Sequence, residues 1–249
     1  MPFTFAHPAL VLPLTRSRYR LSLTGLVAGS MVPDFEFILR MKVDENIGHH
    51  WPGVFVFDLP MALIMCFGFH LLLRNPLIQN LPGWYRDRFS SYSDFNWNQY
   101  AAANSFTLIA SVILGISSHF LWDAFTHDDG GFVLLFPFFR WKMMVFYHAL
   151  PVYTILQVIS SVWGLWMVHQ FIKAMPAEKS EFRSTPGSYS FWWIILLVGM
   201  TLMTGRLMIW PEHQTFWDLF FATMGSCLYA LIFTSFGYRK WKWAISKEQ

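Results

Sequence analysis

The stretch "SFTLIASVILGISSHFLWDAFTHDDGG" (105–131) begins without a charged residue and ends with His119, Asp123 and His127, each four positions after the previous one. With the residues just before it, its apolar part reaches the length of about 20 residues that crosses the hydrocarbon core of a bilayer. Residues four apart share one face of a helix. The stretch therefore predicts a membrane-spanning helix whose last turns carry side chains of the kind that bind metals.

The composition of the whole chain also indicates a membrane protein. Of its 249 residues, 55% are hydrophobic and 13% are charged, whereas soluble domains carry about 25% charged residues. The net charge is only +3, and no basic run is long enough to predict binding to nucleic acid. Cys66 and Cys227 both lie in apolar stretches, which argues against a disulfide framework or a thiolate metal site.

Four more stretches are long and apolar enough to span a bilayer, or nearly so. We therefore predict an all-α integral membrane protein, with an N-terminal half-helix hairpin and about five transmembrane helices. We expect a single polytopic domain over residues 1–249, in which residues 1–137 carry the site motifs and residues 138–249 add three spanning helices. The five predicted spans are 51–73, 100–122, 146–172, 190–210 and 216–238.

The first forty residues follow a different pattern. The apolar segments 3–14 and 21–33 flank the basic sequence "TRSRYR". A helix of 13 residues is only roughly 20 Å long, against a hydrocarbon core of about 30 Å. We predict two half-length helices joined by a basic tip, so that the chain returns to its starting side. The alternative is one spanning helix over residues 21–39.

The distribution of basic residues predicts the orientation of the chain. Most of the 18 Lys and Arg residues fall on one side of the predicted helices, including the hairpin tip and the C-terminal segment. Cytoplasmic loops carry an excess of Lys and Arg. We therefore expect the C-terminus to be cytoplasmic and the His-rich helix ends to lie at the outer face.

His119 and Asp123 can bind one metal ion together, because they lie on the same helical face. His127 continues this face, although "DDGG" (128–131) is expected to end the helix there. Imidazole and carboxylate groups without thiolate suit Zn²⁺ first, with Mn²⁺ or Fe²⁺ as alternatives. Asp123 could instead orient a ligating histidine from the second shell. Both residues could also be ordinary polar residues at a helix end.

Three other segments bring potential ligands to the same side. "MVPDFEF" (31–37) contains two acids, "GHHWPG" (48–53) contains two histidines, and the hairpin returns the chain toward its start. A carboxylate that does not bind the metal could accept a proton from a metal-bound water. We therefore predict Glu36 and Asp123 as catalytic residues, and as metal ligands His7, Asp34, His49, His50, His119, Asp123 and His127.

The order of these motifs resembles known membrane proteins. His7, then Pro33-Asp34, then His49-His50, then "GISSHFLWDAFTHDDGGFVLLFP" (115–137) resembles bacterial inner-membrane proteins described as metal-dependent hydrolases. The segments "MPFTFAHPA" (1–9) and "GLVAGSMVPDFEF" (25–37) are more similar to an uncharacterised family of bacterial multi-pass membrane proteins. The ligand order alone is also similar to soluble, all-helical zinc-dependent phospholipases C.

The resemblance implies a membrane-bound, metal-dependent hydrolase of the bacterial cytoplasmic membrane. A site at the outer face favours a phosphoester or a lipid-linked substrate, with the lipid bilayer itself as a partner. The chain departs from the hydrolase pattern in two places. It has "PDFEF" where those proteins show P-D-x-D-H, and "HHWPG" where they show H-R-G-x-T-H-S. A non-catalytic metal-binding, transport or scaffold protein is therefore the alternative.

Overall fold

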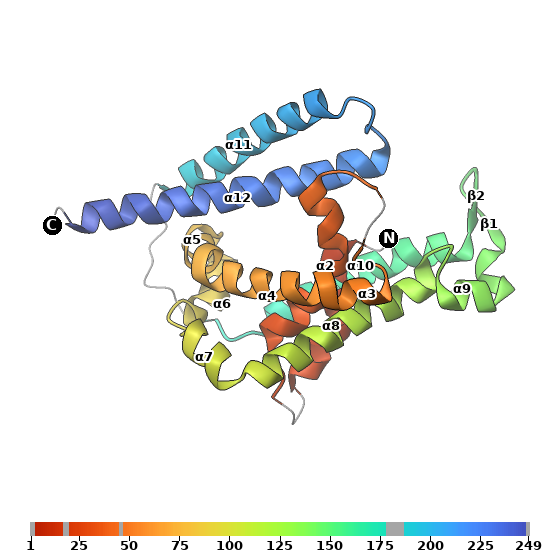
Figure 1. The fold of residues 1–249 in the computed structure, drawn as a ribbon, viewed down its shortest axis with the longest axis horizontal. Coiled ribbons are helices and arrows are strands. Elements are labelled where there is room, and N and C mark those ends of the chain that lie inside the picture. Colours follow the sequence, from red (N-terminus) through yellow and green to blue (C-terminus); the bar gives the residue numbers. More distant parts are fainter. Residues whose placement is uncertain (1–2, 17–19, 45–46, 178–186, 248–249) are drawn as a thin grey trace. The chain divides into compact units, whose positions relative to one another are not determined.

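The computed structural model describes residues 3–16, 20–44, 47–177 and 187–247. These residues are helical almost throughout, which confirms the predicted all-α class (Figure 1). Five helical segments are long and apolar enough to cross a membrane, so the chain has the architecture of a multi-pass membrane protein. They are Trp51–Asn80, Ser105–Leu135, Val152–Lys173, Tyr189–Ile209 and Phe216–Lys240.

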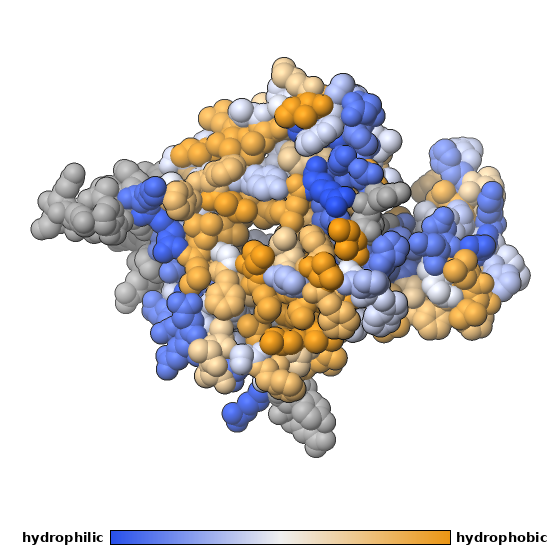
Figure 2. Space-filling view, viewed as in Figure 1, coloured by the Kyte–Doolittle hydropathy of each residue, from blue (hydrophilic) through white to orange (hydrophobic). Residues whose placement is uncertain are grey.

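The helices group into two compact units, each built from three separate parts of the chain. Unit 1 comprises Met1–Asp34, Ile47–Leu63 and Ala101–Ala174. Unit 2 comprises Phe35–Asn46, Ile64–Tyr100 and Met175–Gln249. Apolar side chains cover much of the visible surface (Figure 2), as expected for helices that face lipid.

The N-terminal segment of unit 1 folds back on itself. It begins with three short helical pieces, η1 (Thr4–Ala6), α1 (Pro8–Val11) and η2 (Leu12–Arg16). The Thr4 hydroxyl then donates a 2.7 Å hydrogen bond to Asp34, near the far end of the second helix. This contact supports the predicted return of the chain, although part of the basic tip, residues 17–19, lies outside the described residues.

The second helix of this segment, α2 (Leu23–Arg40), is longer than predicted. We expected a half-length helix that ends at residue 33, but it continues through Pro33 to Arg40, close to the bounds of the alternative helix over residues 21–39. A proline inside a helix removes one hydrogen bond and crowds the preceding turn, but membrane helices tolerate proline where neighbouring groups satisfy the freed backbone. Beyond Pro33, Phe37 and Ile38 are buried, and Glu36 pairs with Arg40 one turn later at 2.6 Å. These contacts stabilise the additional turns.

Helix α8 (Ser105–Thr126) packs against α2 at very close range. A Cβ atom built on Gly29 would lie 2.2 Å from the carbonyl oxygen of Val112, and one built on Gly115 would lie 2.5 Å from that of Leu26. Only glycine permits such a backbone approach. The two helices therefore meet at glycines one turn away from the predicted ligands Asp34 and His119.

The span Trp51–Asn80 consists of several helical pieces. These are α3 (Trp51–Gly53), the π-helix η3 (Val54–Asp58), α4 (Leu59–Gly68), the π-helix η4 (Phe69–Leu73) and α5 (Arg74–Asn80). The connection to α8 is largely helical as well, with α6 (Gly83–Phe89), η5 (Ser90–Tyr92) and α7 (Trp97–Ala103).

A short β-hairpin follows α8 and was not predicted. After α9 (Gly131–Leu135) and η6 (Pro137–Arg140), strands β1 (Lys142–Val145) and β2 (His148–Pro151) pair in antiparallel fashion. Helix α10 (Val152–Lys173) begins only after them. We expected helix from residue 146, but Pro151 stands at the N-cap of α10, and proline is far more compatible with a helix start than with its interior.

In unit 2, α11 (Gly187–Ile209) and α12 (Phe216–Lys247) lie side by side (Figure 1). Thr215 and Asp218 form a capping box at the start of α12. The Asp218 carboxylate accepts from the backbone N–H and hydroxyl of Thr215, and the Thr215 hydroxyl accepts from the Asp218 N–H at 3.2 Å. This reciprocal pair satisfies two donors that a helix start otherwise leaves open.

Candidate metal centre

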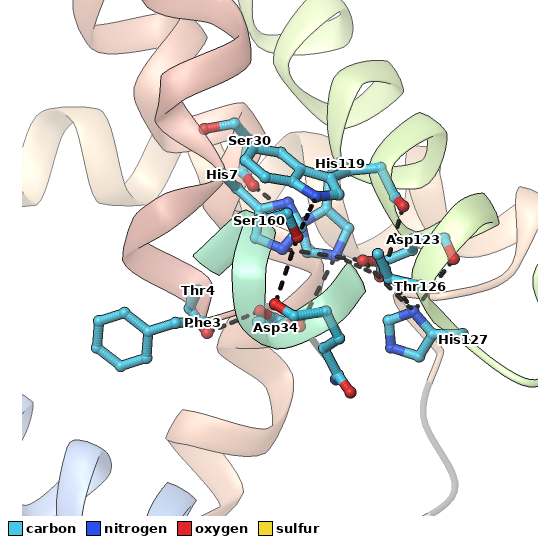
Figure 3. Close-up of polar contacts among 12 residues, drawn as sticks. Phe3, Thr4, His7, Ser30, Asp34, His119, Asp123, Thr126, His127 and Ser160 are labelled. Atoms are coloured by element: carbon cyan, nitrogen blue, oxygen red, sulfur yellow. Dashed lines mark hydrogen bonds and ion pairs between the residues drawn. The ribbon is translucent and has the colours of Figure 1, made fainter. Parts of the chain in front are cut away.

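Five side chains from four segments of unit 1 converge at the end of α8. Two overlapping triads have ligand atoms within 4.8 Å of one another: His7 with His119 and Asp123, and Asp34 with His49 and His119. His119 belongs to both triads. The close-up in Figure 3 shows His7, Asp34, His119 and Asp123 facing a common point.

The separations between these ligand atoms are close to those of a metal site. With bonds of about 2.1 Å, the ligand atoms of a tetrahedral ion are about 3.4 Å apart. His119 Nε2 lies 3.1 Å from Asp123 Oδ2 and 3.7 Å from Asp34 Oδ1. His49 Nε2 lies 3.7 Å from Asp34 Oδ1, and His7 Nε2 lies 3.8 Å from Asp123 Oδ1. Small side-chain adjustments would therefore enclose an ion.

Two hydrogen bonds orient the central ligands. His119 Nδ1 lies 2.9 Å from the backbone carbonyl oxygen of Ser30. A carbonyl oxygen only accepts, so Nδ1 carries a proton, and Nε2 is the nitrogen that faces Asp34 and Asp123. The Thr4 hydroxyl donates to Asp34 Oδ2 at 2.7 Å, which leaves Oδ1 facing the cluster. Metal ligands are typically held in this way by a second layer of hydrogen bonds.

The cluster also contains buried polar atoms that face one another. His7, Asp34 and His119 are fully buried. His7 Nε2 has no hydrogen-bond partner within the described part of the chain, whereas His119 Nε2 lies against the Asp123 carboxylate. Burying a polar atom without a partner is unfavourable. Burial lowers the pKa of His7 to about 3, so its imidazole is neutral, as a metal ligand must be.

The comparison with protein families gives one match. Residues 1–236 match the family described as "Domain of unknown function (DUF4184)". The chain belongs to the DUF4184 family. Comparisons with curated proteins and with solved structures gave no match. The family description assigns no activity, so the resemblance to hydrolases and to phospholipases C stays a prediction for this DUF4184 protein.

The structure separates the two histidines of the "GHHWPG" segment in this DUF4184 protein. His49 reaches the cluster, where its Nε2 lies 3.7 Å from Asp34 Oδ1 and 3.9 Å from Asp123 Oδ2. His50 is exposed and stands at the N-cap of α3. Of the two predicted alternatives, the geometry thus supports His49 as the ligand and leaves His50 outside both triads.

His127 lies at the edge of the centre. It caps the C-terminal end of α8, as the "DDGG" signal predicted. Its Nδ1 lies 3.2 Å from the backbone oxygen of Asp123 and 3.5 Å from the Oδ1 atom of the same residue. His127 is therefore better placed to orient Asp123 than to join either triad.

Glu36, the other predicted catalytic carboxylate, pairs with Arg40 along α2 at 2.6 Å. It is buried and belongs to neither triad. The structure gives no support to Glu36 as a catalytic base.

Two residues of this DUF4184 chain that form hydrogen bonds to the candidate ligands, Thr4 and Ser30, were not predicted. Thr4 precedes His7 by three residues, so the pair occupies neighbouring turns, and this spacing was a usable signal. Ser30 acts through its backbone oxygen, which leaves no mark on the sequence.

Solvent reaches the centre from one side. The side chains of His49 and His127 are 20% and 21% exposed, and that of Asp123 is 11% exposed, whereas those of His7, Asp34 and His119 are inaccessible. A small molecule would therefore approach past His49, Asp123 and His127.

Proposed function

We propose that the cluster around His119 binds one divalent transition-metal ion, with Zn²⁺ the leading candidate and Mn²⁺ or Fe²⁺ as alternatives. The observation that carries this proposal is the convergence of imidazole and carboxylate ligand atoms, most of them buried, within 4.8 Å of one another in two triads that share His119. An ion would satisfy these atoms at once. Nitrogen and carboxylate oxygen ligands suit all three metals.

The geometry favours a single ion over two. His119 is common to both triads, and its Nδ1 is already bonded to Ser30. The remaining nitrogen, Nε2, has one lone pair and can bind one ion only. We therefore assign His119 as the central ligand, with the other positions taken from His7, Asp34, His49 and Asp123.

We propose further that the protein is a membrane-bound metal-dependent hydrolase. A divalent ion in this centre would lower the pKa of a bound water toward about 7 and would polarise a phosphoryl or carbonyl oxygen. More potential ligands are present than the three that a catalytic zinc site requires. One carboxylate can therefore serve the reaction, provided that one coordination position stays open.

Asp123 is the carboxylate best placed for that role. Its Oδ2 faces His119 and its Oδ1 faces His7 and His127. It also lies on the side of the centre that solvent reaches. One oxygen can bind or orient the ligands while the other accepts a proton, and a base placed in this way typically contributes about 10²–10⁴-fold to the rate.

We assign the activity to the outer face of a bacterial cytoplasmic membrane, with the C-terminus in the cytoplasm. The centre lies at the start of the span Trp51–Asn80 and near the end of α8. Consecutive spans cross the membrane in opposite directions, so the start of the first span and the end of the second lie at the same face. The excess of Lys and Arg on the opposite side supports the outer assignment, and a surface position favours a phosphoester or lipid-linked substrate.

A non-catalytic role is the second candidate, because the central ligands are so deeply buried. His7, Asp34 and His119 have no exposed side-chain surface. A metal-binding, transport or scaffold protein could use the same ligands without an open position. Transport sites usually lie near the bilayer midplane, whereas this centre lies at the end of its helices, so we rank hydrolysis first.

The metal proposal is tested by elemental analysis of purified protein. We expect close to one transition-metal ion per chain, and most of it should be lost in His119→Ala and in Asp34→Ala. His70→Ala is the matched control, since His70 lies outside both triads and stacks on Trp97. Equal metal contents in all four proteins would refute the centre.

The hydrolase proposal needs an activity measurement. Metal-loaded protein in detergent should cleave a generic phosphodiester or a phospholipid headgroup, a chelator should abolish the activity, and added Zn²⁺ or Mn²⁺ should restore it. If metal binds stoichiometrically but a wide panel of phosphoesters, esters and amides remains intact, the non-catalytic candidate is the correct one.

A further inference from the structure

The hairpin β1–β2 presents an unusually exposed set of large apolar side chains. Trp141 is 64% exposed, Met144 is 71% exposed, and Phe146 and Tyr147 at the tip are 91% and 95% exposed. Phe146 has a φ of 53°, a conformation that large side chains rarely adopt. The turn thus holds two aromatic rings away from the rest of the protein.

The base of the hairpin is firmly attached to the end of α8, next to the metal centre. The Arg140 guanidinium donates to the backbone oxygen of Asp128 at 2.8 Å. Phe125 stacks on Phe132 with ring centroids 4.1 Å apart. The Val152 N–H donates to the Trp141 carbonyl at 3.0 Å, which connects the hairpin to the first residue of α10. The aromatic tip is therefore presented on a fixed support.

We propose that residues 141–147 form a membrane-surface contact, which lies in the headgroup layer of the same bilayer that the helices cross. The first reason is continuity along the chain. One candidate span ends at Leu135 and the next begins at Val152. A strand of four residues extends only about 13 Å, so the tip cannot move far from the bilayer surface.

The second reason is the chemistry of the hairpin. Trp and Tyr are enriched at membrane interfaces, where an apolar ring lies beside a polar group. Arg140 and Lys142 stand on either side of Trp141 at the base of the hairpin, and both are exposed. Basic residues beside apolar ones bind lipid headgroups through their phosphates. An apolar surface of this kind promotes aggregation when it is exposed to water.

A depth measurement tests this proposal independently of the metal centre and of any activity. Cys66 and Cys227 are replaced by Ala, and Tyr147→Cys carries a fluorophore in protein reconstituted into phosphatidylcholine and phosphatidylglycerol vesicles. The control is Asp129→Cys, in the exposed polar turn after α8. Quenching by iodide reports contact with water, and quenching by nitroxide-labelled lipid reports contact with the bilayer.

At position 147 we expect lipid nitroxides to quench several-fold more strongly than iodide, and the reverse at position 129. Met144→Cys is a second probe on the same hairpin and should behave like position 147. The proposal is overturned if iodide quenches position 147 as strongly as position 129 while lipid nitroxides leave it unaffected. That outcome would identify the tip as a water-facing surface for another protein.

Discussion

His119 of α8 donates a 2.9 Å hydrogen bond from Nδ1 to the backbone oxygen of Ser30 on α2. The same two helices meet through Gly29 and Gly115, close to this bond. The orientation of the His119 imidazole therefore depends on how closely the two helices pack. A change that separates the helices also removes the contact that holds His119 toward Asp34 and Asp123.

The first prediction concerns Gly29→Ala. The added Cβ would lie 2.2 Å from the Val112 carbonyl oxygen, so α2 and α8 must move apart. Overpacking of this kind typically costs about 1–3 kcal/mol. We expect a lower thermal unfolding temperature in detergent and a clear loss of bound metal. Gly68→Ala is the control, because no atom lies within 4 Å of its added Cβ. Full metal occupancy in Gly29→Ala would show that the close packing of α2 against α8 is not required for metal binding.

The second prediction concerns Thr4→Val, which keeps the side-chain shape but removes the donor to Asp34. Loss of a hydrogen bond that orients a metal ligand typically weakens metal affinity about 10–100-fold. Competition with a metal-binding dye measures this change. Ser118→Ala is the control, because its hydroxyl donates to the Gly115 carbonyl on the same helix. If both variants hold metal as tightly as the parent, Asp34 needs no support from Thr4.

Much of the fold follows from the sequence, because hydrocarbon thickness sets the length of a spanning helix. All five predicted spans are present with shifted ends. The α12 start had a readable signal as well, since Thr215 and Asp218 have the spacing of a capping box. The extension of α2 past Pro33 was present only in the alternative helix over residues 21–39. Choosing that alternative depends on burial of Phe37 and Ile38, which only tertiary packing supplies.

The convergence of the candidate residues was predictable to a similar degree. The helical spacing of His119 and Asp123 and the return of the N-terminal segment predicted that these segments meet, and the structure brings them together. The choice between His49 and His50 could not be made, because these neighbours lie in an irregular turn without a repeating direction for side chains. The ion pair of Glu36 with Arg40 was readable from the four-residue spacing.

The third prediction concerns topology, in a background without Cys66 and Cys227. Asp129→Cys lies in the exposed turn after α8, and Ser91→Cys lies in the connection between the first two spans. The excess of basic residues on the side of that connection predicts that it is cytoplasmic. In intact cells, an impermeant thiol reagent should label position 129 and spare position 91. The opposite labelling pattern would reverse the orientation and place the centre in the cytoplasm.

The fourth prediction concerns Asp123→Asn, the most informative change for catalysis. Asparagine nearly preserves the volume, so the fold should persist. It removes the negative charge that lies 3.1 Å from His119 and the oxygen proposed to accept a proton. We expect kcat for a phosphodiester to fall by about 10²–10⁴-fold. Rate measurements at saturating metal separate this effect from weaker metal binding.

The control for this variant is Asp129→Asn, which removes an acid of the same type from the exposed turn six residues further along the chain. Its activity and metal content should match those of the parent. Asp123→Asn should also retain a cooperative thermal transition, which shows that lost activity is not lost folding. Hydrolysis at the parental rate by metal-loaded Asp123→Asn would refute the role of Asp123 as proton acceptor.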